Sequence, residues 1–260
     1  MKRFIFCFLF FNGITQAAPL DEAKTRWLRG NYEEARQAYE KLAKDAKTEV
    51  QAVIGISKTF QSQGEYDKAL ERVEALVKKH PKNADALARK AQLLHLRGQW
   101  DEAFKTAESA VKIKNDQLQA QWVIAQIYRD RGEIAKAAKL FRWFVRTYSE
   151  RSGEENEITD PEELLIVGLA GCENARWYNI SDQFEFILQE IYADAIKKNK
   201  NFWYAELESG LLLLEKHNRG EALDALDKAL TINPTASEAL VGKGIASLNR
   251  LELKVAMRYA

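Results

Sequence analysis

A short phrase recurs along this chain at a fixed spacing, and it constrains the fold more than any other feature. Each copy opens with a glycine and continues into a helix-forming run that has alanine at its sixth position. Successive copies begin at Gly30, Gly64, Gly98 and Gly132, so the interval between them is the same each time. A strict period of about 34 residues indicates a chain built from one repeated supersecondary unit.

Each unit is predicted to be two helices joined by a tight turn. Around Gly64, the apolar side chains of Val53, Ile56 and Phe60 recur at helical spacing and define one face of a first helix. Glycine suits the turn because it adopts positive φ angles. Pro81 ends the second helix because it cannot donate the next backbone hydrogen bond. One such pair cannot bury its own apolar face, so successive units are expected to stack into a solenoid.

The unit resembles the tetratricopeptide repeat, a helix–turn–helix family. With the turn glycine at position 15, the units start at Gln16, Val50, Ala84 and Leu118. The resemblance implies an all-α, right-handed superhelical solenoid of about seven repeats, in which small residues at positions 8 and 20 let the paired helices approach closely. In this chain they are Ala23, Ser57, Ala91 and Ala125 at position 8, and Ala35, Ala69, Ala103 and Ala137 at position 20.

The period breaks after Ser149. Residues 152–163 are acidic, contain Gly and Pro and lack a helical period, so we predict a loop insert between two blocks of repeats. The first block covers residues 18–151. The second covers residues 164–260, with one degenerate long repeat, one regular repeat and one truncated repeat, and the chain is expected to continue past Ala260. Trp143, just before the break, falls at a normally outward position, and the acidic insert is a candidate to cover it.

Residues 1–17 have the composition of a secretory signal. A basic start is followed by an apolar run from Phe4 to Phe11, and small residues precede a cleavage site after Ala17. The run is too short to span a bilayer. We therefore predict an exported protein, periplasmic or secreted, with no stable membrane anchor after cleavage. The alternative is a buried N-terminal helix.

Composition excludes several classes of function. Lys and Arg number 39, Asp and Glu 38, so the charges balance, and a nucleic-acid partner held by phosphate charge is not expected. The chain has three histidines, no His-Glu-x-x-His sequence and no cysteine pair, and we predict no catalytic residue, metal or cofactor. Cys172, the one cysteine beyond the leader, is interpreted as a packed structural thiol.

The resemblance also implies a site, since tetratricopeptide proteins usually bind peptides on the inner face formed by positions 2, 5, 9 and 12 of each first helix. The Lys and Asn with which some members hold a peptide carboxylate are not paired at positions 5 and 9 here. The remaining candidate for the partner-binding site is a groove on this inner face that is rich in side-chain amides. The alternative is that the inner face binds no partner and is only covered by solvent. The candidate residues of the groove are Lys58, Gln92, His95, Trp122, Gln126 and Arg129.

In the second block the same inner positions are apolar, and we expect them to form one patch. Three explanations stay open: burial by the long second helix of the fifth unit or by tighter curvature, a downstream segment of the same chain, or an amphipathic helix of a separate partner. The candidate residues of this patch are Leu207, Leu211, Leu214, Ile245 and Leu248.

These patterns predict an exported protein-interaction scaffold that binds a peptide or protein partner in its concave groove. One alternative is the N-terminal, non-catalytic region of a longer exported enzyme, because the repeats are also similar to regions that precede zinc-peptidase-like domains in some bacterial exported proteins. A cell-envelope assembly factor would differ only in its partner.

Overall fold

The computed structural model describes residues 18–153, 155–249 and 252–259. The predicted leader, residues 1–17, lies outside them. Over the described part of the chain the structure is helical and contains no strand, and none of its helices combines the length and the apolarity that crossing a membrane requires.

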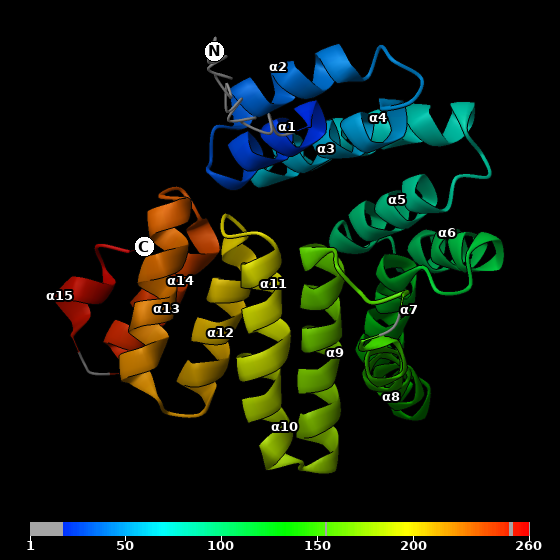
Figure 1. Cartoon of the computed structure of the whole chain (residues 1–260). Helices are drawn as coiled ribbons and strands as arrows, with labels where there is room; N and C mark the ends of the chain where they lie inside the picture. The colour runs from blue at the N-terminus through cyan, green and yellow to red at the C-terminus, as the bar shows by residue number, and fades with distance from the viewer. Residues whose placement is uncertain (1–17, 154, 250–251, 260) are drawn as a thin grey trace, which may run out of the picture.

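Consecutive helices pack in antiparallel pairs, as Figure 1 shows, and seven pairs fall within the described ranges. The predicted all-α solenoid of helix–turn–helix units is therefore confirmed. The pairs are α1 (Pro19–Leu28) with α2 (Tyr32–Leu42), α3 (Glu49–Ser62) with α4 (Tyr66–Lys79), α5 (Ala84–Leu96) with α6 (Trp100–Ile113), α7 (Leu118–Asp130) with α8 (Ile134–Arg151), α9 (Pro161–Tyr178) with α10 (Ser181–Phe186), η1 (Ile187–Tyr192) and α11 (Ala193–Lys198), α12 (Trp203–Glu215) with α13 (Arg219–Ile232), and α14 (Ser237–Leu248) with α15 (Leu253–Ala256).

The predicted register of small residues is also confirmed. Every one of the eight side chains assigned to positions 8 and 20 in the first four units is fully buried. Gly64 has a φ of 76°, as the turn requires. The sixth unit lacks this glycine, and His217 adopts the same backbone conformation there with a φ of 62°.

The fifth unit differs from the prediction at its start. The loop was expected to run to Glu163, but α9 begins at Pro161, a residue favoured in the first turn of a helix. The side chain of Asp160 accepts a hydrogen bond of 2.8 Å from the backbone N–H of Glu162 and so caps the helix. Glu162 and Glu163 are therefore helical. The second helix of this unit is long, as predicted, and contains a π-helical stretch, η1.

The solenoid curves until its first unit meets its sixth. In Figure 1 the blue helices at the N-terminus lie against the orange helices. The ring of Trp27 on α1 lies 5.9 Å from the ring of Tyr204 on α12, and Arg29 Nε donates a hydrogen bond of 3.0 Å to Asn201 Oδ1. One hydrophobic core consequently includes side chains of both units. The first and sixth units, which are far apart in sequence, therefore lie side by side at the inner face.

Candidate functional site

A cavity of about 440 Å³ lies on the inner side of the curve. The first helices of the units converge on it, with α9 forming the wall opposite α3 and α5. The wall mixes charged groups, amides and aromatic rings. Its charged and amide residues are Lys58, Gln61, Asp85, Arg89, Gln92, Lys114, Gln117, Gln119, Asp160, Glu162 and Glu163, and its aromatic residues are Trp27, Trp122, Phe202 and Tyr204.

Arg89 is the unusual member of this wall. Its side chain is 4% exposed, which is rare for arginine. Its Nε donates a hydrogen bond of 2.8 Å to Ser57 Oγ, and its Nη1 donates one of 2.5 Å to Gln92 Oε1. The third nitrogen, Nη2, is buried and has no acceptor among the described residues. Burial lowers the pKa of Arg89 to about 10, so the guanidinium stays charged at neutral pH.

A three-residue ion cluster fixes the adjoining wall. Glu162 at the start of α9 binds Lys58 on α3 and also lies 3.1 Å from Lys24 Nζ on α1. Burial alone would raise the pKa of Glu162, but the two ammonium groups hold it well below its ordinary value. The cluster ties the first, second and fifth units together across the concave side.

Three of the four aromatic residues of the wall, Trp27, Phe202 and Tyr204, come from the two segments that meet where the curve closes, and Trp122 comes from α7. Trp27 Nε1 donates a hydrogen bond of 2.9 Å to Ser62 Oγ, and the ammonium of Lys58 lies 5.3 Å from the centre of the Trp27 ring. Tyr204 packs against Trp27 from α12. These contacts fix the orientation of both rings, so this part of the cavity presents fixed aromatic surface.

A second, smaller cavity of about 280 Å³ continues from the first between α7, α9 and α12, and Trp122 and Leu169 line both. Its charged groups are Arg129, Glu173, Arg176, Glu208 and Glu215. Burial raises the pKa of Glu208 to about 7, and the charge of Arg176 opposes this shift. Within the described ranges no His, Cys, Asp and Glu side chains gather in a group of three that could hold a metal ion.

Comparisons with known proteins agree with the fold. Residues 54–118 match the family model for the tetratricopeptide repeat. The chain has the tetratricopeptide-repeat fold. A search of curated proteins found no match. Among solved structures, a tetratricopeptide repeat protein from Parabacteroides merdae is 15% identical, with 93% of this chain and 89% of that chain covered and a TM-score of 0.51.

Two further structures of the same fold class are similar to this chain. Human IFIT1, solved as a dimer with PPP-AAAA, is 17% identical with a TM-score of 0.59. The alignment covers 93% of this chain and 57% of the IFIT1 chain. The chain therefore spans little more than half of IFIT1. YrrB, described as a tetratricopeptide protein with an unusual peptide-binding site, is 18% identical with a TM-score of 0.40, over 80% of this chain and 98% of that one. At these identities the likeness concerns the fold alone.

The tetratricopeptide register places three of the six predicted inner-face residues together. Lys58, Gln92 and Trp122 line the larger cavity. His95 instead lies 3.1 Å from Asp130, and Arg129 pairs with the same carboxylate at 3.0 Å and lines the smaller cavity. Gln126 is half-buried on α7 and lines neither of these two cavities.

The predicted apolar patch of the second block is not one exposed surface. Leu207 and Leu214 are only 3% and 8% exposed, and they belong to the core. Leu211 is half-buried and lines the smaller cavity. Ile245 and Leu248 on α14 remain exposed, at 44% and 50%.

Among the residues of the cavity wall that sequence reasoning missed are Trp27, Arg89 and Glu162. Arg89 stands at position 6 of its unit and is followed directly by Lys90, so its sequence context did not distinguish it from an exposed cation. Glu162 was overlooked because it was assigned to the loop, although Asp160-Pro161 is a helix start signal. Nothing local to Trp27 or Tyr204 indicated that their two units meet.

Proposed function

We propose that this tetratricopeptide chain is a protein-interaction scaffold that takes a peptide segment of its partner into the larger inner cavity. One observation carries the proposal: the buried guanidinium of Arg89 has a donor, Nη2, without an acceptor at the cavity wall. A buried, charged donor left without an acceptor is costly. An oxygen of a bound peptide would supply the missing acceptor.

The rest of the wall suits an extended peptide. Amides at Gln61, Gln92 and Gln119 can donate to and accept from a peptide backbone, since each carries both kinds of group. Trp27 and Trp122 offer rigid aromatic surface to apolar side chains, and such residues contribute strongly to binding. The opposing charges along the wall, including Glu162, favour a segment that is polar rather than strongly charged.

A library of displayed random peptides selected against the purified chain tests the proposal. The affinities of the selected peptides are then measured by calorimetry for wild type, Arg89→Leu and Arg97→Leu. Arg97 follows the same helix but is exposed outside the cavity, so it is the matched control. We expect Arg89→Leu to weaken binding about tenfold or more, since hydrogen bonds to charged groups contribute roughly 1.5–3 kcal/mol.

Retention of affinity in Arg89→Leu, with circular dichroism confirming the fold of both variants, would exclude this cavity as the binding site. Equal loss in both variants would also count against it, because the effect would then not be local to the cavity.

We further propose that the chain works outside the cytoplasm, after removal of residues 1–17. The basic start and the apolar run before Ala17 motivate this. N-terminal sequencing of protein from its own cells should begin near Ala18 or Pro19, and an intact Met1 on the mature protein would contradict it. The alternative, a non-catalytic region of a longer exported enzyme, stays a prediction.

A further inference from the structure

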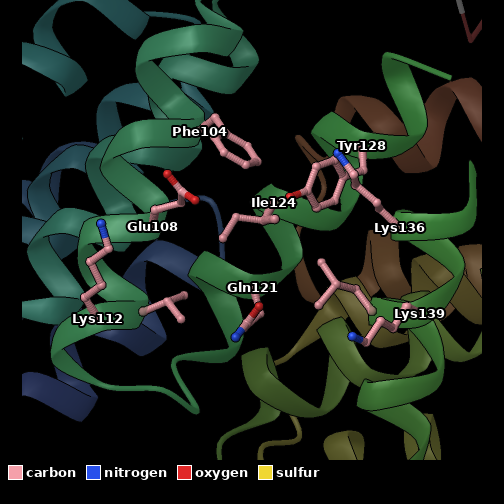
Figure 2. Close-up of a pocket in the computed structure, with 10 residues that line it drawn as sticks. Phe104, Glu108, Lys112, Gln121, Ile124, Tyr128, Lys136 and Lys139 are labelled. Carbon is pink, nitrogen blue, oxygen red and sulfur yellow. The ribbon is translucent and has the colours of Figure 1, made fainter. Parts of the chain in front are cut away.

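The outer face of the solenoid carries a groove that the concave-face function does not use. It lies between α6 and α8, with α7 as its floor, and encloses about 390 Å³. Figure 2 shows Phe104 from α6 and Ile124 and Tyr128 from α7 directed into this hollow, with Lys136 and Lys139 on the α8 side. The floor is therefore apolar and the rim is cationic.

The groove continues along α8. A second hollow on the same helix shares Lys139 and Leu140 with the first and extends to Trp143 and Arg146. From Lys136 to Arg146 the helix rises about 15 Å, or nearly three turns. Trp143 is half-buried there by its contact with Phe144 at 5.0 Å, and no described residue of the acidic insert lines this hollow. The expected cover for Trp143 is therefore not provided by the insert.

Charge on the rim is one-sided. Five cations line the two hollows, Lys112, Lys136, Lys139, Arg142 and Arg146, against one carboxylate, Glu108. Lys136 binds Glu133, and Arg146 lies 3.5 Å from Glu150. Among the described residues, no carboxylate pairs with Lys112, Lys139 or Arg142. The chain as a whole has a net charge of only +1, so this concentration of positive charge is local.

We propose that this outer groove docks an acidic amphipathic helix of a protein partner. An apolar stripe of about three turns would cover the floor formed by Phe104, Ile124, Tyr128 and Leu140, and flanking carboxylates would pair with Lys112 and Lys139. A nucleic acid fits less well, because the centre of the groove is narrow and apolar while phosphate recognition needs cations along a continuous path. The surface is separate from the inner cavity, so the proposal does not depend on the peptide bound there.

Two designed helical peptides, each about five turns long, serve as probes because that length exceeds the groove on α8. Both carry the same Leu and Ile stripe, and one is flanked by Glu while the other is flanked by Lys. Fluorescence anisotropy with the full chain should show the Glu-flanked helix binding at least tenfold more tightly than the Lys-flanked one. Added salt should weaken that binding, since the rim charges are exposed.

Three variants locate the binding. Lys112→Glu/Lys139→Glu should reduce affinity for the Glu-flanked helix at least tenfold and improve affinity for the Lys-flanked helix. Tyr128→Ser should weaken both. Lys105→Glu lies on α6 but outside the groove, so it should leave both affinities nearly unchanged.

The proposal is overturned if the Glu-flanked helix does not bind, if Lys105→Glu has the same effect as the double variant, or if charge reversal at Lys112 and Lys139 changes nothing. It is also overturned if a labelled single-stranded oligonucleotide binds this groove more tightly than the Glu-flanked helix and loses its affinity in the double variant. That result would assign the surface to nucleic acid instead.

Discussion

The side-chain amide of Asn233 donates a hydrogen bond of 3.1 Å to the phenol oxygen of Tyr32, across 201 positions of sequence. Asn233 is fully buried in the loop between α13 and α14, and its Oδ1 accepts hydrogen bonds from the backbone and hydroxyl of Thr235. The amide is therefore held in one orientation. This hydrogen bond joins the first unit to the sixth. Substituting either residue therefore tests whether the two units are in contact.

The coupling between these two residues is measurable by a double-mutant cycle. Tyr32→Phe and Asn233→Ala each remove the bond, while the second change also removes the contacts to Thr235. We expect a coupling energy of about 0.5–1.5 kcal/mol in chemical denaturation, which is the range for one partly buried hydrogen bond. Strict additivity of the two single effects would mean that the units do not meet in solution.

Two turn glycines provide a second test of the closure. Gly30 and Gly64 both have positive φ angles, 81° and 76°, so alanine at either costs about 1–2 kcal/mol of backbone strain. A Cβ at Gly30 would lie 2.5 Å from Asn233 Oδ1, whereas nothing lies within 4 Å of one at Gly64. Gly30→Ala should therefore lower the melting temperature clearly more than Gly64→Ala. Equal losses would show that the sixth unit is not seated on this turn.

Glu162 should contribute stability that disappears in acid. Its folded-state pKa is lowered by Lys58 and Lys24, so its contribution is present above the ordinary value of 4.5 and is lost as the pH falls below it. Glu162→Gln should destabilise the chain at pH 7 by about 1–3 kcal/mol, because Lys58 loses its carboxylate partner and Lys24 keeps only Asp160 at 3.8 Å. The difference from wild type should shrink towards pH 3.

Glu163→Gln is the matched control for that prediction. Burial raises the pKa of Glu163, so neutralising it should not destabilise the chain at pH 7. A cost at Glu163 equal to that at Glu162 would contradict a specific role for the ion cluster.

Glu208 should have the opposite pH dependence. Its folded-state pKa of about 7 exceeds the ordinary 4.5, so between these values the folded state binds more protons and stability falls as the pH rises. Glu208→Gln removes that loss. Since one pKa unit corresponds to about 1.4 kcal/mol, the variant should be more stable than wild type at pH 8 by at most about 3 kcal/mol, and similar at pH 4. Urea titrations at both pH values measure this, and a pH-independent difference would be inconsistent with it.

The repeat architecture was predictable because its signals are local. A glycine that permits a positive φ angle and an alanine that permits close helix contact each act within one unit, and the unit recurs at a constant interval. Ala69 and Ala103, for example, are fully buried at the positions that the period assigned to them.

The enclosed cavity was not predictable in the same way. Trp27 meets Tyr204 because a small rotation between neighbouring units accumulates over five steps along the solenoid. The total rotation cannot be inferred from the sequence of any single unit. The position of Arg89 illustrates the same difficulty. Its charge is evident in the sequence, but its burial depends on α3 and α9 together, and the start of α9 was placed too late in the chain.

The contact between Tyr32 and Asn233 has a consequence for how the chain comes apart. An open solenoid behaves as a row of units coupled to nearest neighbours, and its two ends fray first because each lacks one neighbour. Here the first unit has a neighbour on both sides, α3 and α4 on one and the sixth unit on the other. The first unit is therefore held on two sides, by the second unit and by side-chain contacts to the sixth. Unfolding of the first unit should therefore require contacts on both of its sides to break together, which makes its opening more cooperative than that of a unit with a single neighbour.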